Sequence, residues 1–152
     1  MRQVLPDYTG KAGTEIVPLR HIGGADMGTE PPAGFANASL TAVEAVEDGK
    51  ARHLLLIDLS GSHESAEGYA ALALFDDTTM PQLLDAALVS FDRLVSFEQP
   101  PTVRLAPGDD LVVVGSAHFN SSQGYGTHAM ILPRGGRLEL VDAIWTLDVT
   151  DC

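Results

Sequence analysis

Residues 111–118 read LVVVGSAH, and residues 126–132 read GTHAMIL. The first segment is rich in valine, a β-branched residue that is enriched in strands, and the second is a short apolar run. The residues between them are small, polar or aromatic, which is typical of a connecting loop. We therefore predict two antiparallel strands joined by a hairpin whose turn is centred near Gln123.

The same alternation of short apolar runs and turn residues extends along most of the chain. Further strands are predicted at residues 52–59, 69–75, 82–90, 103–105 and 137–147, separated by turns that are rich in Gly, Pro and Asp. Successive short strands indicate a mainly β fold, and no strand alternates with a long helical pattern. We predict an antiparallel meander that forms a β-sandwich or a partly open barrel.

The last predicted strand changes its apolar face part of the way along. Leu138 and Leu140 share one face, whereas Val141, Trp145 and Leu147 fall on the other in a regular strand. Such a change predicts either a β-bulge near Val141 or a strand that contributes to two sheets.

Residues 40–46 allow two interpretations. Leu40, Val43 and Val46 are spaced as on one face of a helix, but Asp48-Gly49 is a strong hairpin signal. We favour a strand, in which Ala42 and Val43 pair with residues 53–56 across that turn.

The N-terminal residues 1–38 differ from the rest because prolines and glycines interrupt them throughout. We predict a single domain over residues 1–152, with a β core at 39–147 and an irregular N-terminal segment that covers the core or forms an arm. One short strand is expected at Glu15 to His21. Residues 54–57 are apolar on both faces, so either this segment or a dimer partner is expected to cover them.

Composition and charge exclude some classes of partner. The net charge of −12 disfavours binding to nucleic acid. The chain also lacks a basic patch of the kind that binds to an anionic membrane surface. Cys152 is the only cysteine, so no intrachain disulfide forms, and its role stays open between a free thiol and an interchain bond. No transmembrane segment is evident. Because this strand-turn rhythm is typical of exported bacterial β domains, we favour a periplasmic or secreted location over a cytoplasmic one.

The stretch from Gly115 to His128 is the predicted working surface. Exposed aromatic residues beside adaptable polar residues suit recognition of a protein or small molecule. We expect a non-enzymatic binding module without a cofactor. Its predicted binding residues are Phe119, Asn120, Ser122, Gln123 and Tyr125.

Two alternatives remain open. The predicted hairpin places His118 opposite His128, with Cβ atoms about 5 Å apart. With a nearby acid these histidines could hold a metal, or one could activate Ser116 or Ser121 in a hydrolase. A homodimeric structural subunit, joined through the strands that are apolar on both faces, is the other alternative.

Overall fold

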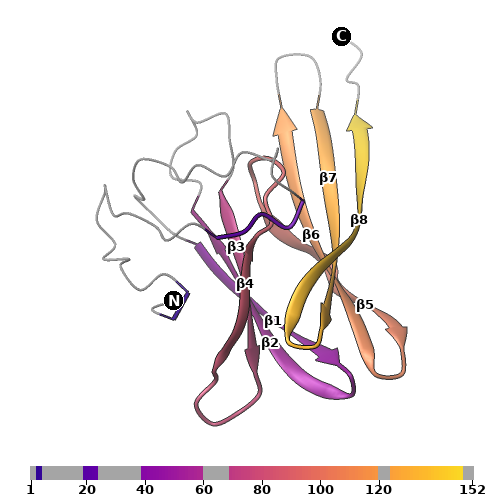
Figure 1. Cartoon of the computed structure of the whole chain (residues 1–152). Helices are drawn as coiled ribbons and strands as arrows, with labels where there is room; N and C mark the ends of the chain where they lie inside the picture. Colours follow the sequence, from indigo (N-terminus) through magenta and orange to yellow (C-terminus); the bar gives the residue numbers. More distant parts are fainter. Residues whose placement is uncertain (1–2, 5–18, 24–38, 60–68, 120–123, 149–152) are drawn as a thin grey trace.

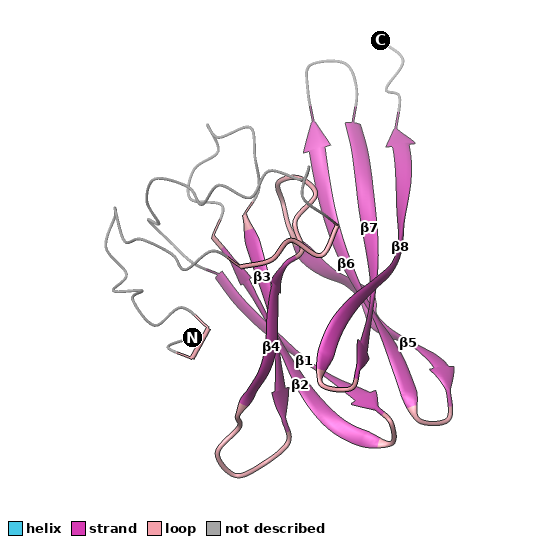
Figure 2. Ribbon diagram, viewed as in Figure 1, coloured by secondary structure: helices cyan, strands magenta, loops and turns pink. Residues whose placement is uncertain are grey.

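The computed structural model describes residues 3–4, 19–23, 39–59, 69–119 and 124–148 (Figure 1). Within these ranges the chain forms antiparallel strands and no helix (Figure 2). The strands are β1 (Ser39–Glu47), β2 (Lys50–Asp58), β3 (Ala70–Asp76), β4 (Leu83–Leu88), β5 (Ser96–Ala106), β6 (Asp109–Phe119), β7 (Gly124–Arg134) and β8 (Arg137–Asp148).

Each strand pairs with the next along the chain, within two separate four-stranded sheets, β1-β2-β3-β4 and β5-β6-β7-β8. The predicted antiparallel meander is therefore confirmed, and the two sheets do not close into a barrel. No helix that could cross a membrane occurs in the ranges described.

The main core lies between the two sheets. Its buried residues come from both sheets and include Leu54, Leu56, Leu72, Leu74, Phe97, Val112, Val114, Ile131 and Leu138. Removal of this apolar surface from water is the dominant favourable contribution to folding.

A second apolar cluster covers the outer face of the first sheet. Ile57 is fully buried there, and Leu55 packs against the same cluster. Val4 and Leu19 from the N-terminal part of the chain are among the residues that contact it. Both faces of β2 are thus covered from within the chain.

The two predicted tight turns are present. Asp48 and Gly49 have φ values of 50° and 72°, and Gly135 and Gly136 have values of 59° and 73°. Positive φ at both turn positions matches the right-handed twist of the flanking strands, which explains the glycines. β1 is a strand, as favoured above, and Ala42 and Val43 pair with Leu55 and Leu54.

The bulge predicted near Val141 is also present. Ile131 pairs with Leu140 but Met130 pairs with Asp142, so Val141 is the extra residue. This insertion lets one strand place apolar side chains inward on both sides of it.

β5 is longer than predicted. The sequence indicated a strand at 103–105 because Pro100 and Pro101 are strand breakers, but β5 begins at Ser96. The pairing with β6 shifts between Phe97 and Thr102, and this irregularity accommodates the prolines on an edge strand. Of the strand expected at Glu15 to His21, residues 15–18 lie outside the described ranges.

Carboxylates link the two sheets through backbone N–H groups. Val46 donates to Asp110 Oδ2 and Asp48 to Asp109 Oδ1, both at 2.8 Å. On the other side of the sandwich, Leu138 N–H donates to Asp85 Oδ2 at 2.8 Å. Some of the acidic excess therefore serves the fold, because these carboxylates satisfy backbone donors that do not belong to a ladder.

His21 joins the N-terminal part of the chain to β4. It forms a parallel bridge with Leu88, and its ring lies edge-on to Phe91 at 5.7 Å between centroids. Gly23 N–H donates to His21 Nδ1 at 2.9 Å, so the proton of the neutral ring sits on Nε2 and is donated to the Ser90 carbonyl, also at 2.9 Å. Burial lowers the pKa of His21 below its usual 6.5, although the Ser90 bond opposes this.

This arrangement predicts a loss of stability in mild acid. A lowered folded-state pKa means that the unfolded chain binds more protons between that pKa and 6.5, so the free energy of unfolding falls as pH drops through this window. We expect His21→Gln to flatten this dependence in urea-unfolding curves. His53→Gln, which changes an exposed histidine paired with Asp77, is the control and should keep the pH dependence of the wild type. Equal pH profiles for wild type and His21→Gln would contradict the prediction.

Candidate functional site

The pairing of β6 with β7 corrects the predicted hairpin. His118 pairs with Tyr125, and His128 pairs with Gly115. Because side chains alternate between faces, an offset of three residues places the two histidines on opposite faces of the sheet. The prediction that they face each other is wrong, and a metal site that uses both histidines does not form.

The error arose from the extent of the strands. β6 continues to Phe119 and β7 starts at Gly124, so residues predicted as loop belong to the ladder. Four predicted site residues, Asn120, Ser121, Ser122 and Gln123, lie outside the described ranges. Phe119 is exposed on β6, and Ser116 is buried on the same face as His118.

Asp92 organises a polar cluster on the inner face of the second sheet. Tyr125 donates its hydroxyl to Asp92 Oδ2 at 2.5 Å, and His118 Nδ1 lies 3.2 Å from Asp92 Oδ1. Arg93 N–H donates to the same Oδ1 at 2.7 Å. The hydrogen bond to Asp92, followed by burial and by the carboxylate charge, raises the pKa of Tyr125 above its usual 10.

Asp92 comes from the segment that connects the two sheets. Ala117 N–H donates to the Arg93 carbonyl at 2.8 Å, which fixes this segment against β6. Leu94 follows with a φ of 54°, a left-handed conformation that is unfavourable for leucine. The connection therefore holds Asp92 in place at a local cost in backbone strain.

Aromatic rings continue from this cluster across the inner face. His118 stacks on Tyr125 with centroids 5.2 Å apart and an angle of 11° between the rings. Trp145 lies 5.7 Å from Tyr125, and Phe91 meets Trp145 edge-on at 6.3 Å. We call Phe91, His118, Tyr125 and Trp145 the ring cluster.

The ring cluster has one exposed ring, that of Trp145, and lies beside the buried hydroxyl of Thr127. Trp145 is 57% exposed even though it contacts two other rings. Thr127, which pairs directly with Trp145 and Ser116, is 1% exposed. None of the described residues forms a hydrogen bond with its Oγ1, which is uncommon for a buried polar atom.

His128 lies in a different cluster on the outer face. Its Nδ1 is 2.9 Å from Glu98 Oε1, and its Nε2 is 3.4 Å from Thr146 Oγ1. A Cβ at Gly115 would lie 2.1 Å from Glu98 Oε1, and one at Gly126 would lie 3.0 Å from Thr146 Oγ1. These glycines lie within strands, where they make room for the polar side chains of their neighbours.

We predict that Gly115→Ala separates Glu98 from His128 at a cost of less than about 1 kcal/mol, because the clash involves only the end of a flexible side chain. The His128 imidazole resonances should move in NMR spectra. Gly108→Ala is the contrast: its Cβ would lie 3.1 Å from the backbone nitrogen of Gly49, so we expect a loss of about 1–2 kcal/mol with His128 unchanged. Unmoved His128 resonances in Gly115→Ala would contradict this assignment.

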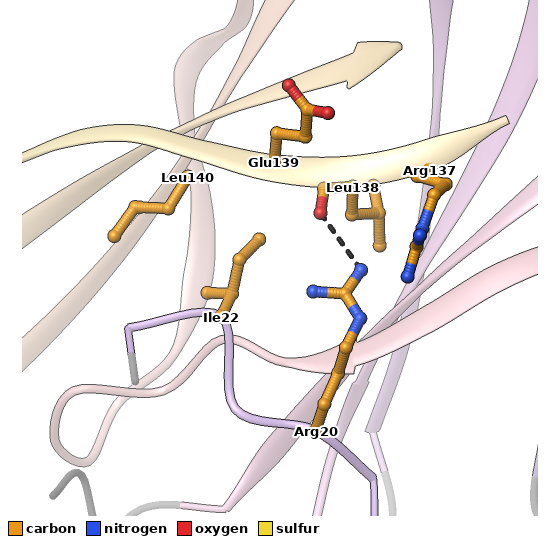
Figure 3. Close-up of a pocket in the computed structure, with 6 residues that line it drawn as sticks. All are labelled: Arg20, Ile22, Arg137, Leu138, Glu139 and Leu140. Atoms are coloured by element: carbon orange, nitrogen blue, oxygen red, sulfur yellow. Dashed lines mark hydrogen bonds between the residues drawn. The ribbon is translucent and has the colours of Figure 1, made fainter. Parts of the chain in front are cut away.

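Two cavities lie elsewhere on the protein. One, of about 290 Å³, is lined by Arg20, Ile22 and the first residues of β8 (Figure 3). Arg20 spans it, bonded to Asp85 and to the Leu138 carbonyl at 2.9 Å, so its guanidinium already has partners. The other, of about 560 Å³, is lined by Lys50, Ala51, Arg52, Asp76, Asp77, Thr78 and Leu84. Neither contains a predicted site residue.

The described side chains include no cluster of three or more His, Cys, Asp or Glu residues that could hold a metal. Comparison with protein-family models, with curated proteins and with solved structures gave no match. Function therefore has to be argued from the side chains themselves.

Three members of the candidate site, Phe91, Asp92 and Trp145, were not predicted from sequence. Asp92 lies in a connection that carries no motif, so only the fold brings it to His118 and Tyr125. Trp145 is the only tryptophan, and the alternation of β8 beyond the predicted bulge placed it on the same face as Leu147. Together with the pairing of β7 and β8, that alternation could have placed Trp145 on the inner face, beside Tyr125.

Proposed function

We propose that this protein is a binding module whose recognition surface is the ring cluster with Asp92. The observation that carries the proposal is the series of rings from His118 through Tyr125 to the half-exposed Trp145. Partly exposed aromatic rings provide large, rigid contact area at low entropic cost.

The polar groups favour a ligand that has both a flat or apolar face and hydrogen-bonding groups. His118 engages Asp92 through Nδ1, which directs its Nε2 away from the carboxylate. The buried Thr127 hydroxyl, for which the described residues offer no hydrogen-bond partner, adds a polar group beneath the rings. A small oligosaccharide or an aromatic peptide side chain has both features.

Fluorescence of Trp145 tests this proposal, because this residue is the only tryptophan. We expect saturable quenching by at least one member of a defined panel of soluble oligosaccharides and aromatic amino-acid amides. Tyr125→Ala should abolish the response, and Leu105→Ala, which changes an exposed side chain on β5, should retain it. A panel without any saturable response, or an equal response in Tyr125→Ala, would overturn the proposal.

A hydrolase is the second candidate. A carboxylate at Nδ1 orients an imidazole so that Nε2 can act as a general base, and Asp92 stands in that relation to His118. Ser116 shares the inner face but is buried, which disfavours it as a nucleophile. A fluorophosphonate probe that labels wild type but not His118→Ala would favour hydrolysis over simple binding.

The homodimer alternative takes a different form from the one expected. The faces of β2 are covered within the chain, so β2 offers no large exposed apolar side chain. Large exposed apolar residues gather instead on the edge strand β8, at Val141, Ile144, Trp145 and Leu147.

A further inference from the structure

The outer edge of β8 changes character along its length. At Leu138 the edge is occupied, because its N–H donates to Asp85 and its carbonyl accepts a hydrogen bond from Arg20. Beyond the bulge at Val141, Ala143 donates its N–H to Asp142 Oδ1 at 2.8 Å, and no described residue bonds to that edge at Trp145 or Leu147. Residues 143–147 read AIWTL and contain no ionisable side chain, although a fifth of the whole chain is charged.

The backbone groups of this segment point outward. Ala117 donates its N–H to Arg93, on the side away from β7, so the N–H and carbonyl of its partner Gly126 point toward β8. Gly126 pairs with Thr146, and the direction alternates along a strand. The residues on either side therefore direct their backbone groups to the outer edge. Trp145 and Leu147 present both groups there, whereas Ala143 presents its carbonyl, because Asp142 accepts its N–H.

Both faces of this edge carry exposed apolar side chains. Trp145 and Leu147 on the inner face are 57% and 67% exposed, and Ile144 on the outer face is 49% exposed. An unpaired edge with exposed apolar residues is a template for pairing with another strand. The opposite edge of this sheet is protected, because β5 contains Pro100 and Pro101.

We propose that residues 143–147 pair antiparallel with the same residues of a second copy of this chain, about a two-fold axis at Trp145. In this register the small Ala143 faces the large Leu147 of the second copy, and Ile144 faces Thr146. Apolar and β-branched pairs of this kind stabilise antiparallel strands. The segment is thus complementary to itself, as a two-fold interface requires.

The pairing completes the proposed recognition surface. Trp145 of one copy lies directly beside Trp145 of the second copy, so the two ring clusters become one continuous aromatic strip across the axis. The significance of this strip rests on the proposed binding function, whereas the pairing itself does not.

Charge and area set the strength of the association. Each copy carries a net charge of −12, so salt should strengthen the dimer by screening repulsion. A seam of five residues buries less than a standard interface, so we expect a weak dimer with a dissociation constant on the order of 10 μM.

Sedimentation equilibrium of the full chain tests the pairing. We expect a concentration-dependent dimer in wild type, and at least a tenfold weaker association in Ile144→Glu, which places two like charges in the seam. Val103→Glu makes the same change on the opposite edge strand, where Val103 is 46% exposed, and should behave like wild type. A wild type that stays monomeric at high concentration and high salt, or a dimer that Val103→Glu disrupts and Ile144→Glu spares, would overturn the inference.

Disulfide formation tests the register. In a Cys152→Ser background, the double substitution Ile144→Cys and Thr146→Cys should give a covalent dimer on oxidation, because these positions face each other across the axis. Glu139→Cys with Val141→Cys should not. A covalent dimer only in the second variant would exclude the proposed register.

Trp145 fluorescence separates this inference from the proposed function. Dimers that respond to no member of the ligand panel would leave the pairing standing and remove the binding function. A ligand response in monomeric Ile144→Glu equal to that of wild type would show that the second copy does not complete the surface.

Discussion

Replacing Glu47 with alanine is expected to lower the free energy of unfolding by about 3–5 kcal/mol. Glu47 is only 2% exposed, at the end of β1. Its carboxylate accepts a hydrogen bond from Arg52 Nε at 2.5 Å and another from Gly136 N–H at 2.6 Å. The substitution leaves a largely buried guanidinium and a backbone N–H without their partner, and both costs fall on the folded state.

Two variants calibrate this prediction in urea-unfolding experiments. Glu44→Ala changes an exposed carboxylate on the same strand and should cost less than about 0.5 kcal/mol. Glu47→Gln keeps an acceptor for Gly136 but loses the charge opposite Arg52. Its loss of unfolding free energy should therefore lie between those of Glu44→Ala and Glu47→Ala. A loss in Glu47→Ala no larger than in Glu44→Ala would show that the link between β1 and the β7–β8 turn contributes little.

Much of the fold could be predicted because its signals are local. Asp48-Gly49 and Gly135-Gly136 specify turns through backbone conformation alone. The bulge at Val141 could be predicted because an extra residue shifts the apolar pattern of β8.

The predictions that were wrong concern features that depend on residues distant in the sequence. The register of β6 against β7 was misplaced because small polar residues suit both a loop and a strand, and glycine there indicated a turn. In the structure Gly115 and Gly126 instead accommodate Glu98 and Thr146, which come from other strands. The first part of β5, which contains Pro100 and Pro101, was missed for a related reason, since the penalty for proline in a strand disappears at an edge.

The candidate site shows the same division. The sequence directed attention to the stretch that contains His118 and Tyr125, because aromatic and polar residues gather there. It could not supply Asp92, whose position depends on how the chain crosses from one sheet to the other. A polar side chain in a connecting segment can be assigned to a site only when the structure shows which strands it contacts.

Removal of Asp92 is the second change for which we expect a large effect. Asp92 is buried and accepts hydrogen bonds from the Tyr125 hydroxyl and Arg93 N–H, beside the His118 ring. Asp92→Ala leaves these donors without their acceptor, so we expect a loss of about 2–3 kcal/mol in the free energy of unfolding. Glu139→Ala, which removes an exposed carboxylate on β8, is the stability control.

The conservative variant Asp92→Asn separates the role of the carboxylate charge from that of shape. The hydrogen bond to Asp92, burial and the carboxylate charge raise the pKa of Tyr125, so the amide should bring that pKa back toward 10.

Because the raised pKa belongs to the folded state, its contribution to stability is complete below pH 10 and is lost as pH rises through the folded-state value. In Asp92→Asn this loss should begin at lower pH. Absorbance titration of tyrosinate measures the pKa, and subtraction of the Tyr125→Phe curve isolates Tyr125 from the other two tyrosines. Urea-unfolding curves at increasing pH measure the loss of stability. An unchanged Tyr125 titration in Asp92→Asn would mean that burial alone sets its pKa, and that Asp92 does not organise the ring cluster.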